Sequence, residues 1–94
     1  MDIAYDPAKD AINIAKHGLS LSEFAGFDDT PKVIVDYRRD YGEVRFQARG
    51  RIAGRPFCLV YVETLKGIRI ISLRRAHEKE IRRYEQAVRD NPGF

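Results

Sequence analysis

The chain has 94 residues, 44% apolar and 33% charged, with a net charge of +3. This length suits one domain over residues 1–94, and the five Phe and five Tyr exclude a disordered tail. The lone Cys58 excludes an internal disulfide and a cysteine-rich zinc site. We expect no membrane association and a cytoplasmic location, because no stretch is apolar enough to span a bilayer and residues 1–6 lack signal-peptide features.

The charge is unevenly distributed along the chain. Residues 1–43 carry five Lys/Arg against nine Asp/Glu, whereas residues 44–94 carry twelve against five. A basic half of this kind suits a polyanion such as nucleic acid, an acidic protein partner, or a solvated surface without a ligand. Charge alone does not decide among the three.

Two helices are predicted after a short N-terminal strand over residues 1–5. Asp6-Pro7 provides a cap and a first helical position, and Gly18 ends that helix. Its buried face should consist of the residues at helical spacing, Ala8, Ala11, Ile12 and Ala15. A capping box of Ser20 and Glu23 predicts a second, short helix that ends by about residue 27.

Four strands follow, predicted over residues 32–38, 43–52, 56–64 and 68–73, and a final helix over residues 77–89 should bury Ile81, Tyr84 and Val88. In the second strand, Val44, Phe46, Ala48 and Ile52 should face the core, while the opposite face is a ladder of Arg45, Gln47, Arg49 and Arg51. The expected fold is therefore α+β: an antiparallel sheet of about four strands plus a short N-terminal strand, two N-terminal helices and one C-terminal helix.

The chemistry indicated by the residues is metal-free. Neither His17 nor His77 has an acidic residue at a zinc-ligand spacing, and no glycine-rich phosphate loop occurs, so we expect no metal or cofactor. The densest basic cluster is Arg69, Arg74, Arg75, Lys79, Arg82 and Arg83 around one strand-to-helix junction, with Glu80 and Tyr84 four residues apart on one helical face.

This cluster has a functional and a structural interpretation. Arginine meets two phosphate oxygens at once and stabilises charge on a phosphate transition state, while Glu, His, Lys or Tyr can exchange protons. Alternatively, Glu80 pairs with helix-surface arginines and Tyr84 belongs to the core. Lys16 and His17 also have two interpretations. Either they interact favourably with the dipole at the C-terminus of their helix, or they face the same phosphate as the arginines.

Five sequence elements in one order resemble the BrnT family of bacterial toxins. They are Asp6-Pro7-x-Lys9 with Asn13, Lys16-His17-Gly18, Gly42-Glu43-x-Arg45, Arg69-Ile70-Ile71-Ser72-x-Arg74-x-Ala76, and Glu80-x-Arg82-x-Tyr84. The sequence departs from the family at Tyr5, where Trp is usual, and in a short segment after Asp28-Asp29. Neither departure touches the basic cluster.

The resemblance implies a RelE-like fold and a metal-independent endoribonuclease toxin that inhibits translation. It also implies neutralisation by a BrnA-type antitoxin with a ribbon-helix-helix domain, through which the complex binds operator DNA. The implied catalytic residues are Arg74, Glu80, Tyr84, His17 and Lys16, without assignment of base and acid. The implied RNA-binding residues are Arg45 and Glu43. From the basic cluster itself we expect Arg69, Arg75, Arg82 and Arg83 to bind RNA as well.

Two other functions stay open from the sequence. The predicted ladder of Arg45, Gln47, Arg49 and Arg51 suits a non-catalytic module that follows an RNA backbone without cutting it. The same basic face also suits a protein-interaction module whose partner is acidic.

Overall fold

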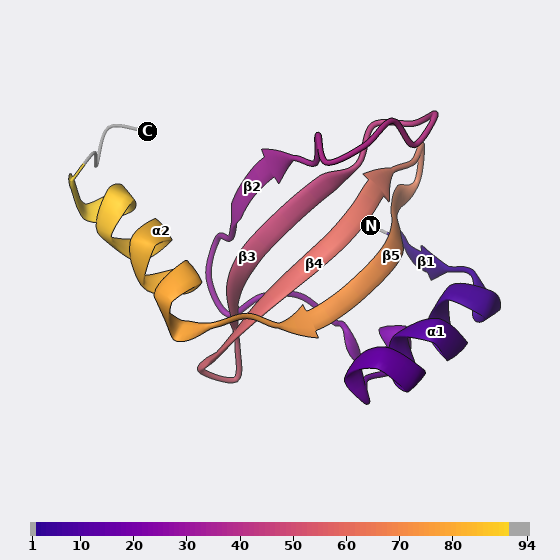
Figure 1. The fold of residues 1–94 in the computed structure, drawn as a ribbon, viewed down its shortest axis with the longest axis horizontal. Coiled ribbons are helices and arrows are strands. Elements are labelled where there is room, and N and C mark those ends of the chain that lie inside the picture. Colours follow the sequence, from indigo (N-terminus) through magenta and orange to yellow (C-terminus); the bar gives the residue numbers. More distant parts are fainter. Residues whose placement is uncertain (1, 91–94) are drawn as a thin grey trace.

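A computed structural model describes residues 2–90, which form five strands, two α-helices and one 3₁₀ turn (Figure 1). In chain order these are β1 (Asp2–Tyr5), α1 (Pro7–His17), the 3₁₀ turn η1 (Leu21–Glu23), β2 (Lys32–Val35), β3 (Phe46–Ile52), β4 (Arg55–Glu63), β5 (Gly67–Arg75) and α2 (Glu78–Asp90). No helix in this part of the chain is long and apolar enough to cross a membrane.

All five strands form one sheet in the order β1-β5-β4-β3-β2. Strands β2 to β5 pair antiparallel, as the alternating sequence predicted, but β1 pairs parallel with β5. The sheet is therefore mixed, and the expectation of a four-stranded antiparallel sheet with a separate N-terminal strand is wrong. The chain returns through α1 and the following loop, so β1 can join the free edge of β5 in the same direction.

The expectation of three helices is also wrong. The predicted second helix is the single 3₁₀ turn η1, although Ser20 does cap it by accepting a hydrogen bond from the Ser22 amide. Gly26 has φ +125°, which is incompatible with helix, and Phe24 and Phe27 pack edge to face instead. Gly50 on β3 leaves room for Phe27 to pack against the strand, since a Cβ at position 50 would lie only 2.8 Å from the Phe27 ring. Burial of two aromatic rings therefore outweighs the local capping signal.

The core lies on one face of the sheet, where η1 and Phe24 cover it. Its buried members are Leu21, Phe24, Ala48, Leu59, Ile70 and Leu73. The register places Arg49 and Arg74 on either side of Cys58, on the opposite face. Alternation thus sends Arg49 and Arg51 of β3 and Arg74 of β5 away from the core, as predicted for Arg49 and Arg51. Val44 was expected in the core but precedes β3 and is 62% exposed.

Helix α1 has the predicted bounds, with Asp6 capping it by accepting from the Ala8 amide. The predicted buried face is wrong: Ala8, Ala11, Ile12 and Ala15 are exposed, and Asn13 is buried instead. The Asn13 side chain donates to the Leu19 and Leu73 carbonyls and accepts from the Leu73 amide. The helix contacts the sheet at its β5 side, so one polar anchor replaces an apolar face (Figure 1).

Candidate functional site

A hollow of about 500 Å³ lies between α1, the loop of residues 36–45 and the polar face of the sheet. We call it the basic pocket. Its lining residues are Lys9, Ile12, Asn13, Lys16, His17, Arg38, Arg39, Tyr41, Arg45, Gln47, Cys58, Val60, Ile71, Ser72 and Arg74. Three chain segments far apart in sequence therefore build it.

The charges in this lining have one sign. Among the described residues that line it, six are Lys or Arg and none is Asp or Glu. Such a concave surface focuses a positive potential and attracts anions. The basic pocket is therefore suited to a phosphate-bearing ligand.

Arg74 occupies one wall of the basic pocket and also contacts α2. Its guanidinium lies 3.5 Å from the Glu80 carboxylate, and the Arg49 guanidinium lies 3.7 Å from the same carboxylate. Burial raises the pKa of Glu80, but the Arg74 hydrogen bond and both positive charges outweigh burial, so its pKa lies below the usual value. Glu80 is thus held ionised beside the pocket without lining it.

Lys16 and His17 form the last turn of α1 and bring two more polar groups to the pocket. Their position depends on Asn13, whose hydrogen bonds fix α1 to the β5 backbone directly beside Arg74. Helix α1 thus carries the two residues to the same hollow as the β5 arginine. The structure brings together Lys16, His17, Arg45 and Arg74.

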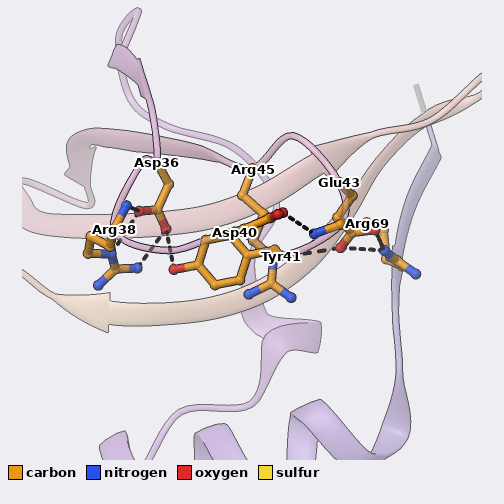
Figure 2. Close-up of polar contacts among 8 residues, drawn as sticks. Asp36, Arg38, Asp40, Tyr41, Glu43, Arg45 and Arg69 are labelled. Atoms are coloured by element: carbon orange, nitrogen blue, oxygen red, sulfur yellow. Dashed lines mark hydrogen bonds and ion pairs between the residues drawn. The ribbon is translucent and has the colours of Figure 1, made fainter.

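The 36–45 loop forms the opposite wall and is organised by a buried carboxylate (Figure 2). The Asp36 side chain is fully buried and accepts from Arg38 Nε at 2.8 Å, Arg38 Nη2 at 2.7 Å and the Tyr41 hydroxyl at 3.3 Å. The Arg38 hydrogen bonds hold the pKa of Asp36 far below its usual range. Asp36 therefore remains charged and fixes both partners.

Arg45, Glu43 and Arg69 meet at the end of the same loop (Figure 2). Arg69 Nη2 lies 2.8 Å from the Glu43 carboxylate, and Arg45 Nε lies 3.6 Å from it. Of the three, only Arg45 lines the basic pocket; Glu43 and Arg69 line a separate hollow of about 580 Å³ with Val44 and Phe46. Glu43 therefore acts on the pocket through Arg45.

Three further predicted residues, Arg75, Arg82 and Arg83, do not line the pocket. Arg75 lies on the other sheet face, 5.9 Å above the Phe57 ring. Arg82 is exposed and pairs with Glu78 one helical turn away, and Arg83 is exposed on α2. The Tyr84 and Val88 side chains lie outside the described residues, whereas Ile81 is buried as predicted.

The predicted arginine ladder does lie on the face of the sheet away from the core, but carboxylates of α2 pair with part of it. Arg51 is held by Glu85 at 3.0 Å and Glu78 at 3.4 Å, and these hydrogen bonds raise its pKa. Arg49 faces Glu80. Helix α2 therefore supplies carboxylates to the far end of the ladder, and only Arg45 and Gln47 open onto the pocket.

Sequence reasoning gave no site role to the lining residues Arg38, Arg39 and Tyr41, and Ser72 appeared only within the family-like segment from Arg69 to Ala76. The signal available for the first three was the dense charge of residues 36–45, which was interpreted as a strand end and a turn. Lys9 and Asn13 appeared only as family-like positions. In the part of the chain that the structure describes, no group of three or more His, Cys, Asp or Glu could hold a metal ion.

Comparison with known proteins gives the family. A search of curated proteins found no match to the chain. A family model described as "Ribonuclease toxin, BrnT, of type II toxin-antitoxin system" matches residues 5–80, which include every residue that lines the basic pocket. The resemblance found in the sequence is thereby confirmed: the chain belongs to the BrnT family of type II toxin-antitoxin ribonuclease toxins.

Proposed function

We propose that this BrnT chain is a metal-independent endoribonuclease that acts in the cytoplasm and holds an RNA phosphodiester in the basic pocket. The observation that carries the proposal is the charge of the lining: six Lys/Arg side chains from three segments, with no carboxylate among the lining residues that the structure describes. A family of ribonucleases requires a phosphate site, and this hollow has the charge that phosphate needs.

Arg45 and Arg74, which both line the basic pocket, are the proposed phosphate-binding groups. Their planar donors can meet two phosphate oxygens at once and stay charged at any relevant pH. As the phosphate becomes pentacoordinate it gains negative charge, which the same groups stabilise. Lys9 and Lys16 on α1 add positive charge from the third side.

The proposed reaction is attack by the ribose 2′-oxygen on the adjacent phosphorus. A base removes the 2′-hydroxyl proton, the new O2′–P bond forms, the P–O5′ bond breaks, and an acid protonates the leaving 5′-oxygen. The products are a 2′,3′-cyclic phosphate and a 5′-hydroxyl end. His17 and Lys16 lie in the pocket for proton exchange, Glu80 is an ionised base at its margin, and Tyr84 is proposed to orient the base or ribose.

The test uses the purified chain and a short RNA with one cleavage site, in the presence of a chelator. We expect cleavage with a cyclic-phosphate end, and no cleavage when the scissile nucleotide carries a 2′-deoxyribose. Equal cleavage of both substrates would contradict the 2′-hydroxyl mechanism. Salt-dependent binding of intact RNA without cleavage would favour the non-catalytic module instead.

The toxin-antitoxin family implies a protein partner, and we propose a BrnA-type ribbon-helix-helix antitoxin that covers the basic pocket with acidic or capping groups. Operator DNA would be bound only by the complex, through the antitoxin. Expression of the chain alone should arrest growth and inhibit translation, and co-expression with the antitoxin should restore both. Harmless expression of the folded chain alone would contradict the proposal.

A further inference from the structure

The residue that sets the direction of the Arg45 guanidinium is Tyr41, which neither the family motif nor the sequence reasoning singled out. We propose that Tyr41 is a positioning residue: its ring, tied to the buried Asp36 carboxylate, holds Arg45 at the wall of the basic pocket in the orientation that binds phosphate. The proposal rests on the function proposed above and names what fixes one of its phosphate-binding groups.

The first step is the anchoring of the loop. The Asp36 amide donates to the Arg45 carbonyl at 2.8 Å, which closes the 36–45 loop next to the β2–β3 pairing. The Asp36 carboxylate then accepts from Arg38 and from the Tyr41 hydroxyl. Since that carboxylate is buried and stays charged, it keeps Tyr41 in one place beside the pocket.

The second step is the stacking of Arg45 on the ring. Arg45 Cζ lies 3.9 Å from the Tyr41 ring centroid, close to the ideal distance for a cation over an aromatic face (Figure 2). Arg39 Cζ is farther away, at 5.9 Å. Stacking restricts the plane of the Arg45 guanidinium but occupies none of its N–H groups, whose edges remain available to a phosphate.

The third step is a comparison with Arg38, which lines the same wall. Two Arg38 nitrogens are committed to Asp36, so its charge is largely compensated within the loop. Arg45 has a carboxylate near it as well, that of Glu43, but this carboxylate is 3.6 Å from Arg45 Nε. Glu43 is also shared with Arg69, whose Nη2 lies 2.8 Å from it. Tyr41 thus holds Arg45 together with a more distant, shared carboxylate, and the charge of Arg45 is compensated less than that of Arg38.

The test compares Tyr41→Leu and Tyr41→Phe with a matched control, Tyr37→Leu, on the same loop. We expect kcat/KM for a short RNA to fall roughly tenfold in Tyr41→Leu, because the guanidinium loses its stacking partner and its fixed direction. Tyr41→Phe keeps the ring and should restore most of this loss. Tyr37 is 85% exposed and does not line the pocket, so its variant should cleave like the wild type.

A double-mutant cycle separates positioning from a general structural effect. In an Arg45→Ala background, Tyr41→Leu should cause no further loss, because the residue through which it acts is gone. In an Arg74→Ala background the roughly tenfold loss should persist. The same tenfold loss in both backgrounds would overturn the proposal.

Two measurements keep the proposal separate from the function and from folding. In the first, the same double-mutant cycle is measured on the binding of an oligonucleotide with a 2′-deoxyribose at the scissile position. If the wild type cleaves no RNA, the proposed function fails, but a coupling energy between Tyr41 and Arg45 in oligonucleotide binding still supports the positioning role. Nuclear magnetic resonance of the wild type gives the second measurement. Arg45 side-chain protons above the ring should be shifted upfield, and unshifted resonances would overturn the proposal even if Tyr41→Leu failed to fold.

Discussion

Two groups of arginines share the polar face of the sheet and differ in what lies opposite them. Arg45 and Arg74 line the basic pocket, although Glu43 lies 3.6 Å from Arg45 and Glu80 lies 3.5 Å from Arg74. Arg49 and Arg51, on the same strand face as Arg45, meet Glu78, Glu80 and Glu85 of α2. The difference teaches that a basic strand face becomes a candidate anion site where it opens onto a hollow, and not where α2 covers it.

The largest expected effect lies at Arg74, where the two groups meet. Arg74→Ala should lower kcat for RNA cleavage by about 10² to 10³-fold, the usual cost of removing a group that stabilises transition-state charge. Arg75→Ala is the matched control, since Arg75 is adjacent in sequence but lies on the other sheet face. Single-turnover cleavage assays of both variants test this. Equal losses of kcat in Arg74→Ala and Arg75→Ala would mean that the sheet face on which an arginine lies does not determine its contribution to cleavage.

Asn13→Ala should give the next largest effect, on stability. Truncation leaves the buried Leu73 amide and carbonyl without their side-chain partner, which should cost about 3 kcal/mol. Urea denaturation followed by circular dichroism measures the loss. Ile14→Ala, at the neighbouring and exposed position of the same helix, serves as the control and should change stability little. An unchanged midpoint for Asn13→Ala would contradict the anchoring of α1.

Asp36→Asn tests the pocket wall formed by the 36–45 loop. Loss of the charge-assisted hydrogen bonds should cost about 2 kcal/mol at neutral pH, since Arg38 itself is largely exposed and keeps its hydration. Because folding lowers the pKa of Asp36, its contribution is complete above about pH 4, the ordinary value for Asp, and is lost as the pH falls further. The stability gap between wild type and variant should therefore narrow in acid. A gap independent of pH would contradict this.

The smallest effect is expected at Arg51. Arg51→Ala removes an ion pair to α2 and touches no residue that we propose to bind RNA, so kcat/KM should change by less than about twofold. Steady-state cleavage assays at several salt concentrations would check this. A loss comparable to that of a pocket arginine would mean that α2 moves aside to admit RNA.

Local signals predicted much of the fold but not its assembly. The Asp6-Pro7 start and Gly18 end of α1, and the alternation in β3, act over a few residues and are confirmed. The parallel pairing of β1 with β5 depends on residues more than 60 positions apart, and no local pattern contains it. The capping box at Ser20 was outweighed by burial of Phe24. In the two wrong predictions, contacts between residues distant in sequence decided the structure.

The candidate site shows the same limit. Lys16, His17, Arg45 and Arg74 were named from the sequence, and the structure brings them to one hollow. Arg75, Arg82 and Arg83 were named on local charge density and lie elsewhere, because the side of the strand and the position of α2 decide what each can reach. Asp36 and Tyr41 could not be found from charge density, since their role comes from burial and from ring geometry.

The most direct test of the difference between the two arginine groups is the salt dependence of RNA binding, measured with an oligonucleotide carrying a 2′-deoxyribose at the scissile position. Each phosphate contact contributes about 0.7 to the slope of log K against log salt for single strands. We predict that Arg45→Ala reduces the slope by about this amount and that Arg51→Ala leaves it unchanged. Equal reductions in the two variants would contradict the account.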